Sequence, residues 1–211
     1  MNNMKEVDPH TTKRAEAFRM WMKAPMPMVT MTKTLDVTRL VRISKRHGLK
    51  FNMLMCWCIT KAASTIKEFR LLPVNGKLIQ YDKLAVNVIV TNRNGRISSC
   101  DIPFDNDFAK FIKDYNTLTE QCRSECKDLT EYDRMVVGTS ALVETELDSV
   151  VNMWSGIYAN PMLFWGKRRK HWWRTRLPVS FQFHHVQMDG KEAAQFLNAL
   201  QQVLSNNTDY A

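Results

Sequence analysis

The C-terminal part of the chain has the clearest pattern of apolar and polar positions. Apolar Val179, Phe181 and Phe183 alternate with polar residues, and this period of two predicts a strand with one buried face. After Gly190 the period changes to that of a helix. One apolar stripe then follows, formed by Ala193, Phe196, Leu197, Leu200, Val203 and Leu204. The pattern therefore predicts a half-buried strand, a short connection and an amphipathic helix.

Three helices are expected earlier in the chain. Positions 52–69 are apolar on most sides, which predicts a helix in the centre of the fold. A shorter amphipathic helix is expected to begin at a cap formed by Asp36 and to end at Gly48. Large apolar residues recur at helical spacing from Phe108 onwards, so a third helix is expected there, with Asp105 as its cap.

Strands are expected between these helices. Positions 84–90 are β-branched and apolar, and the Asn-Gly pair at 94–95 offers a type I′ hairpin turn into a second strand at 96–100. Another strand is expected at 135–141. Because no repeat, low-complexity tract or linker divides the sequence, we expect one α/β domain over residues 1–211, an open sheet with helices laid on it.

Composition excludes several classes of protein. The chain has 211 residues, of which 45% are hydrophobic, and this is enough for one buried core and argues against disorder. No apolar run approaches the roughly 18 residues that span a bilayer, and the N-terminus lacks the apolar core of a signal peptide. We therefore expect a cytoplasmic protein without a membrane partner.

The cysteine residues predict neither disulfides nor a metal site. Their number is odd and their spacings differ from those of zinc sites, so reduced thiols and no bound metal are expected. The residues are Cys56, Cys58, Cys100, Cys122 and Cys126.

The connection after the predicted C-terminal strand carries the residues best suited to chemistry. It reads His184-His185-Val-Gln-Met-Asp189-Gly190. The reference pKa of histidine, about 6.5, lets one of the pair act as a general base near neutral pH. A structural interpretation is also open, because Asp189 could cap the following helix with Glu192 completing a capping box, and the histidines could satisfy only their own hydrogen bonds.

At this point the sequence resembles the chloramphenicol acetyltransferase family, whose members carry His-His-x-x-x-Asp-Gly. The resemblance extends over nearly the whole chain. Its other parts follow in the family's order, namely Arg14-x-x-x-Phe18-x-x-Trp21, the segment 29–38, Lys50-Phe51, Ser140-Ala141-Leu142, Asp148-Ser149 and Leu177-Pro178. The resemblance implies a two-layer sandwich in which helices cover a mixed, largely antiparallel sheet.

The resemblance also implies a reaction and a role for each matching residue. His185 would be the base that takes a proton from an acceptor hydroxyl as its oxygen attacks the thioester of acetyl-CoA. Ser149 would donate to the oxyanion, and Asp189 would pair with Arg14 to hold the histidine loop. Family members are homotrimers with the site between subunits. From the residues alone, a turn or cap is the more usual explanation of Ser149, and a solvated surface position is the more usual explanation of Arg14.

Two further groups of residues are assigned to ligands. Met20, Trp21 and Met26 are expected to line the acceptor pocket.

The run 167–176 holds six of the 30 basic residues, which together with 21 acidic ones give a net charge of +9. This run has three interpretations: a coenzyme A site, a solvated loop or a nucleic-acid patch. We favour the coenzyme A site, with Lys167 and Arg168 as the residues that bind it, because the run directly precedes the predicted strand that leads into the histidine motif.

Some positions depart from the family pattern. Phe164 stands where a threonine is usual, and Arg168 stands where a tyrosine usually packs beside the adenine. The leading hypothesis is an acetyl-CoA-dependent O-acetyltransferase that acts on chloramphenicol or a similar compound. The alternatives are a non-catalytic, ligand-binding trimer of the same fold and, in third place, a nucleic-acid-binding module.

Overall fold

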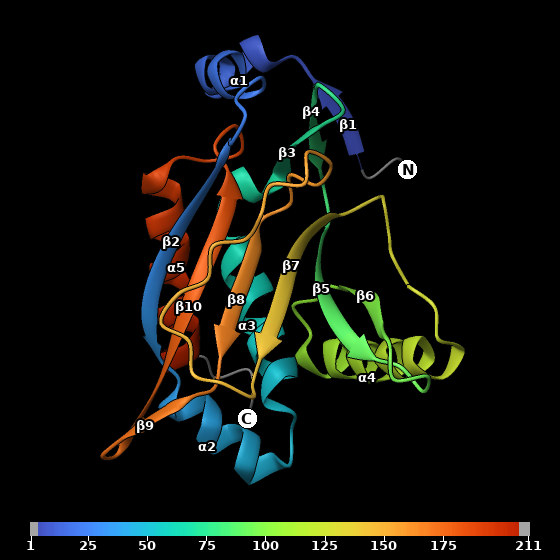
Figure 1. The fold of residues 1–211 in the computed structure, drawn as a ribbon, viewed down its shortest axis with the longest axis vertical. Coiled ribbons are helices and arrows are strands. Elements are labelled where there is room, and N and C mark those ends of the chain that lie inside the picture. Colours follow the sequence, from blue (N-terminus) through green and yellow to red (C-terminus); the bar gives the residue numbers. More distant parts are fainter. Residues whose placement is uncertain (1–3, 207–211) are drawn as a thin grey trace.

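Helices and strands alternate along residues 4–206, the part of the chain that the computed structural model describes (Figure 1). The strands are β1 (Met4–Val7), β2 (Met28–Asp36), β3 (Leu71–Val74), β4 (Lys77–Tyr81), β5 (Leu84–Thr91), β6 (Ile97–Pro103), β7 (Met135–Leu142), β8 (Met162–Gly166), β9 (Arg169–His171) and β10 (Arg174–His184). The α-helices are α1 (Ala15–Trp21), α2 (Thr38–His47), α3 (Phe51–Ser64), α4 (Phe108–Glu125) and α5 (Gly190–Asn206). Short 3-10 helices lie at Pro9–Thr11 and Lys67–Arg70.

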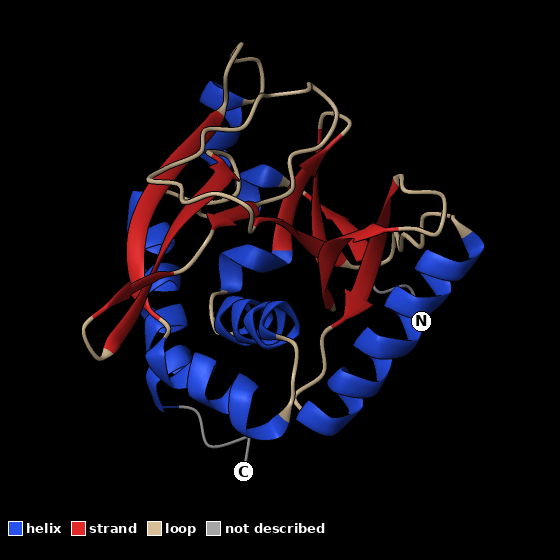
Figure 2. Ribbon diagram, turned by 60° about the horizontal axis from the view of Figure 1, so that its bottom comes forward, coloured by secondary structure: helices blue, strands red, loops and turns tan. Residues whose placement is uncertain are grey.

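The main sheet combines antiparallel and parallel strands. Its order is β2-β10-β8-β7-β5-β6, and β9 pairs with β10. Strand β7 runs parallel to both β5 and β8, whereas the other pairs are antiparallel. Figure 2 shows the longer helices gathered on one side of this sheet, and α1 lies apart from them at its end (Figure 1). The α/β class and the mixed, helix-covered sheet are therefore confirmed.

A second, three-stranded sheet, β1-β4-β3, was not expected from the sequence. Its hairpin turns at Asn75-Gly76, where both residues have positive φ, 49° and 78°, as a type I′ turn requires. The prediction of such a turn at positions 94–95 was wrong. There Thr91 pairs with Ile97 across a five-residue loop, and only Gly95 has a positive φ.

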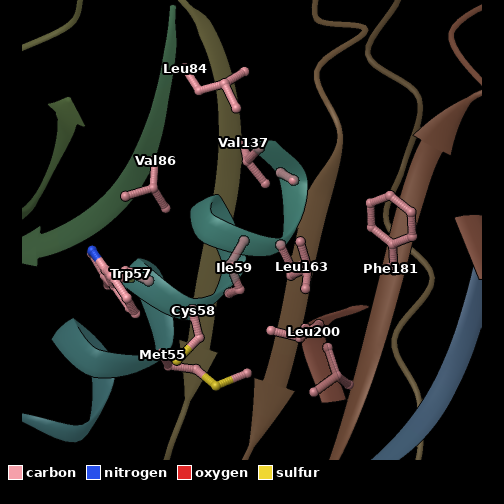
Figure 3. Packing of buried hydrophobic residues seen from close by; sticks show 14 of the residues in the cluster. Met55, Trp57, Cys58, Ile59, Leu84, Val86, Val137, Leu163, Phe181 and Leu200 are labelled. Carbon is pink, nitrogen blue, oxygen red and sulfur yellow. The ribbon is translucent and has the colours of Figure 1, made fainter. Parts of the chain in front are cut away.

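Helix α3 lies in the centre of the core, as its apolar composition predicts. Figure 3 shows Ile59 of this helix beside Leu163 of β8, and Trp57 on the side of Val86 of β5. The helix ends at Ser64 rather than at position 69, and a 3-10 turn follows it.

The two predicted N-caps are displaced by one or two residues. Asp107, rather than Asp105, caps α4, since its carboxylate accepts from the N–H groups of Ala109 and Lys110. Helix α2 begins after Val37, and Asp36 accepts one hydrogen bond from Thr38 N–H. Gly48 ends α2 with a φ of 65°, as expected.

Strand β10 is buried on both faces, so the prediction of one buried face was wrong. A segment without regular structure, residues 143–161, crosses the polar face of the strand and is called the covering segment (Figure 1). Val150 N–H donates to Ser180 Oγ at 2.8 Å, and Gln182 Nε2 donates to the Asn152 carbonyl at 2.9 Å. The polar residues of β10 are thus buried because the covering segment satisfies their hydrogen bonds.

The expectations about thiols and membrane-spanning segments can be compared with the described residues. All five cysteines are free thiols there, and burial raises the pKa of the Cys56 thiol to about 12. Within residues 4–206, no helix combines the length and the apolar character that crossing a membrane needs. Nor does this part of the chain hold three or more histidine, cysteine or acidic side chains grouped as metal ligands.

Candidate active site

His185 lies directly after β10, where two other elements fix its backbone. Its N–H donates to the carbonyl of Pro27, just before β2, at 2.8 Å. Its carbonyl accepts from Arg14 Nη2 at 2.6 Å, and Arg14 stands at the start of α1. The histidine is therefore held on a rigid connection between a central strand and α5.

The His185 ring is oriented by two side chains. The Trp21 ring stacks on it, with centroids 4.8 Å apart and planes 7° from parallel. On the ring edge, Nδ1 lies 3.1 Å from Oδ1 of Asp189. The pair does not meet the geometry of a full hydrogen bond, but the carboxylate is close enough to interact electrostatically with the ring.

This arrangement determines which ring nitrogen can accept a proton. A neighbouring carboxylate favours the proton on Nδ1, which leaves the lone pair on Nε2. Nδ1 is inaccessible, whereas 29% of the His185 side chain is exposed. The accessible surface therefore lies on the rest of the side chain, where Nε2 stands.

Asp189 and Arg14 form the ion pair that the family resemblance implies. The two guanidinium nitrogens donate to the two carboxylate oxygens at 2.6 and 2.8 Å. Arg14 Nε also donates to the Val186 carbonyl at 2.8 Å. Hydrogen bonds from Arg14 lower the pKa of Asp189, because they stabilise its charged form.

The structural interpretations of these two residues are only partly correct. Arg14 is 6% exposed, so it is not a solvated surface residue. The carboxylate of Asp189 faces Arg14 and does not cap α5. One half of the capping box does form, since Glu192 accepts from the Asp189 N–H at 3.2 Å.

His184, the other histidine of the pair, has contacts that indicate a structural role. Its Nδ1 accepts a hydrogen bond from Val186 N–H at 3.1 Å, and the Trp154 ring meets its ring edge-on. Burial, together with the neighbouring His185, lowers the pKa of His184 to about 4. A neutral imidazole is required for the bond to Val186, so His184 supports the loop and His185 is the candidate base.

Ser149 is not brought to His185 within one chain. It is exposed and lies on the covering segment, where the neighbouring Val150 is bonded to Ser180. Five residues of extended chain separate Ser180 from His185, which at about 3.3 Å per residue corresponds to about 16 Å. One copy of the chain therefore holds these two predicted catalytic residues apart.

The predicted acceptor residues lie at the same end of the molecule as His185. Met20, on α1, is 49% exposed and Met26, in the loop before β2, is 54% exposed. Trp21 was expected only to line the pocket, but its stacking makes it a direct neighbour of the candidate base. A single chain leaves both methionines on an open surface.

The predicted coenzyme residues lie at the other end of the sheet. Lys167 and Arg168 follow β8 and are exposed, and the Arg168 guanidinium lies over the Phe51 ring at 4.3 Å. Phe164 of β8 pairs with Ser180 and is 7% exposed. The structure thus places Phe164 beside the covering segment rather than next to His185.

Two parts of the site had no signal in the sequence. The Pro27 carbonyl that anchors His185 is a backbone group, and residue type does not reveal its partner. The contact of Trp154 with His184 depends on how the covering segment folds over β10. Trp154 stands among other apolar residues of this segment, so its type alone did not single it out.

Comparisons with known proteins agree with this geometry. A family model described as chloramphenicol acetyltransferase matches residues 1–201. The chain belongs to the chloramphenicol acetyltransferase family. Chloramphenicol acetyltransferase 2 of Escherichia coli is 26% identical, with 97% of this chain and 98% of the relative covered. The Bacillus pumilus chloramphenicol acetyltransferase is 25% identical, with 92% and 90% covered.

Solved structures of the family and of related acyltransferases share the fold. A chloramphenicol acetyltransferase structure superposes with a TM-score of 0.81 at 20% identity, covering 96% of this chain and all, 100%, of that one. A dihydrolipoamide acetyltransferase of Azotobacter vinelandii gives a TM-score of 0.67 at 18% identity, with 91% and 86% covered. Family membership makes this chain an acyltransferase with an acyl-CoA donor.

Proposed function

We propose that this protein transfers an acetyl group from acetyl-CoA to a hydroxyl of chloramphenicol or a similar small molecule. The observation that carries the proposal is the setting of His185, stacked on Trp21 and with Nδ1 beside Asp189. Such a setting leaves Nε2 as a proton acceptor on a fixed ring, which is what general-base catalysis needs.

The proposed reaction is a direct transfer without an acetyl-enzyme. Nε2 of His185 takes the proton of the acceptor hydroxyl while that oxygen forms a bond to the thioester carbon. The Ser149 hydroxyl donates to the resulting oxyanion, a contribution of roughly 10²- to 10³-fold in rate. The tetrahedral intermediate then releases the thiolate of coenzyme A, which receives the proton back from the imidazolium.

The site is proposed to be completed between subunits of a homotrimer. Ser149 and His185 are too far apart in one copy, so the serine that serves a given histidine would come from a neighbour. The covering segment also exposes large apolar residues, which suit contact with a second copy. These are Val151, Met153, Ile157 and Tyr158, exposed by 74%, 78%, 74% and 70%.

The coenzyme is assigned to the basic end of β8 in the same scheme. Lys167 and Arg168 would contact its phosphates and adenine, since guanidinium groups pair with phosphate and stack on planar rings. We assign the protein to the cytoplasm, where acetyl-CoA would be available.

Thiol release from acetyl-CoA tests the proposal. Chloramphenicol and a panel of small hydroxyl compounds are offered to the protein, to His185→Ala and to His47→Ala, a control at the exposed end of α2. We expect turnover by the protein and the control and a loss of at least about 10²-fold in His185→Ala. Turnover that is unchanged in His185→Ala would exclude the mechanism.

Phe164 favours one alternative, a trimer that binds ligands without catalysis. An apolar ring replaces the usual threonine and cannot donate or accept a hydrogen bond. Calorimetry with coenzyme A distinguishes the two functions. Binding of coenzyme A without turnover on any acceptor would favour the alternative, and binding with turnover would exclude it.

A further inference from the structure

The tip of the β9–β10 hairpin carries two exposed tryptophans. The strands pair His171 with Arg174, so Trp172 and Trp173 alone form the turn. The two side chains are 76% and 69% exposed. Their rings lie 5.8 Å apart and are nearly perpendicular, at 84°. The hairpin projects beyond the main sheet at the lower left of Figure 1, and both tryptophans line a hollow of about 290 Å³ together with His171, Arg174 and Arg176.

The backbone at Trp172 is strained. Its φ is 53°, in the left-handed region, at the first central position of a two-residue turn where glycine is usual. A bulky residue in this region is an outlier that the rest of the structure must hold in place. Glycine would relieve the strain, and solvated rings contribute nothing to the core. The two rings contact each other and His171, and they lie outside the buried core.

The strands below the tip carry positive charge. Arg169 is paired with Glu146 and Asp148, and Arg174 lies 3.9 Å from Asp36. Arg176 also interacts by charge with Asp36, whereas the described part of the chain provides no ion-pair partner for Lys167 or Lys170. A cavity of about 550 Å³ beside the hairpin is lined by Thr34, Glu146, Arg169, Lys170, His171, Arg176 and Pro178. Three of these seven lining residues are lysine or arginine, and one, Glu146, is acidic.

We propose that this hairpin attaches the protein to an anionic phospholipid surface. Tryptophan is enriched at the boundary between lipid and water, where its ring is buried and its N–H remains solvated. Basic residues close behind the ring would meet the lipid phosphates, each strengthening binding at a negatively charged leaflet. The sequence expectation of no membrane partner considered spanning segments and a signal peptide, and this attachment needs neither.

The geometry favours a lipid surface over a single-stranded nucleic acid. Nucleic-acid sites of this kind combine a basic groove with aromatic faces on which successive bases stack. Here the two rings are perpendicular and stand on a projecting tip. A flat, deformable lipid surface can receive both rings at once. Two successive bases are parallel to each other, so they cannot both stack on two perpendicular rings.

Sedimentation with lipid vesicles tests the proposal. The protein is mixed with vesicles of phosphatidylcholine alone and of phosphatidylcholine with phosphatidylglycerol. We expect binding to the anionic vesicles that weakens with salt, and little binding to the neutral ones. Trp172→Gly with Trp173→Ser should weaken binding at least about tenfold, because burial of a large apolar side chain is lost. Lys170→Gln should weaken it about fivefold.

Matched controls distinguish vesicle binding by the hairpin from nonspecific binding by other exposed aromatic or basic side chains. Tyr132→Ser removes another exposed aromatic ring, 81% accessible, and Lys113→Gln removes an exposed positive charge on α4. Both should bind vesicles as the unchanged protein does. Light scattering and thermal melting check that the tryptophan variant keeps its size and fold, which relief of strain at Trp172 favours.

Three results would overturn the proposal. One is vesicle binding that the tryptophan variant retains in full. Another is a change of oligomeric size in that variant, which would make the hairpin a subunit contact. The third is salt-sensitive binding of a single-stranded oligonucleotide without any binding of vesicles. None of these results depends on acetyl transfer.

Discussion

Arg14 and Asp189 are 175 positions apart in the chain, yet their side chains form two parallel hydrogen bonds. The same guanidinium reaches the carbonyls of His185 and Val186. A single arginine at the start of α1 therefore holds the whole connection between β10 and α5. The candidate base depends on a residue from the far end of the sequence for its position.

Loss of this pair should destabilise the protein. Arg14→Lys keeps a charge but cannot form the bidentate contact, and Asp189→Asn leaves the buried guanidinium without its anion. We expect each change to lower the free energy of unfolding by about 1–3 kcal/mol, since Asp189 is half exposed and partly screened. Urea unfolding of both single variants and the double variant measures this. Fully additive effects would show that the two residues are not coupled.

Trp21 should act through the His185 ring. Trp21→Ala removes the stacked partner, and we expect kcat to fall about tenfold with a smaller change in the KM for acetyl-CoA. Trp21→Phe should restore most of kcat because it restores a stacking surface. Steady-state kinetics over both substrates provides the measurement. An effect confined to the KM for the acceptor would assign Trp21 to the pocket alone.

Ser149→Ala should separate activity from stability. The residue is exposed, so the free energy of unfolding should change by less than about 0.5 kcal/mol. We expect kcat to fall by roughly 10²- to 10³-fold. Mixing Ser149→Ala chains with His185→Ala chains, after unfolding and refolding together, should recover part of the activity if the site is shared between subunits. No recovery would place both residues in one chain.

His184 should make stability depend on pH. Its pKa is about 4 in the folded chain and about 6.5 when unfolded, so the unfolded chain binds more protons between these values. The contribution of the neutral ring is fully present above pH 6.5 and is lost as pH falls through 4, by about 3 kcal/mol in total. Urea midpoints across this range, compared with His184→Asn, test the sign. A variant with the same pH dependence would contradict it.

Asp189 adds a second effect at lower pH. Its pKa is lowered by Arg14, so its contribution is present above the ordinary aspartate value and is lost as the pH falls through the lowered one. Acid unfolding of Asp189→Asn should therefore lack this last loss of stability. Circular dichroism during acid titration measures it, and an unchanged acid midpoint would argue against the ion pair.

The periodicity of the sequence predicted those elements whose apolar residues face one core. Helices α3 and α5 and strands β5 and β7 are of this kind, and all begin close to their expected positions, although α3 ends five residues before the expected end. The polar positions of β10 were misread as solvent-facing. Their burial depends on Val150 and Asn152 from the covering segment, which has no periodicity of its own.

The candidate site was predicted from a sequence motif, which does not show how far apart its residues lie in the folded chain. His185, Asp189 and Arg14 were identified and do come together. The separation of Ser149 from His185 could not be seen in the sequence, because it follows from which strand the covering segment crosses. The Asn75-Gly76 turn was open to prediction by the same rule that was applied at positions 94–95.

Strand β10 is one unbroken element of 11 residues, from Arg174 beside the hairpin turn to His184 beside the base. At about 3.3 Å per residue it is about 36 Å long, so the two tryptophans and the imidazole occupy opposite poles. Immobilising the protein through position 172 or 173, on a sensor chip or a bead, would keep the His185 end of the strand away from the support. Such a tether would permit reaction measurements on oriented, surface-bound molecules.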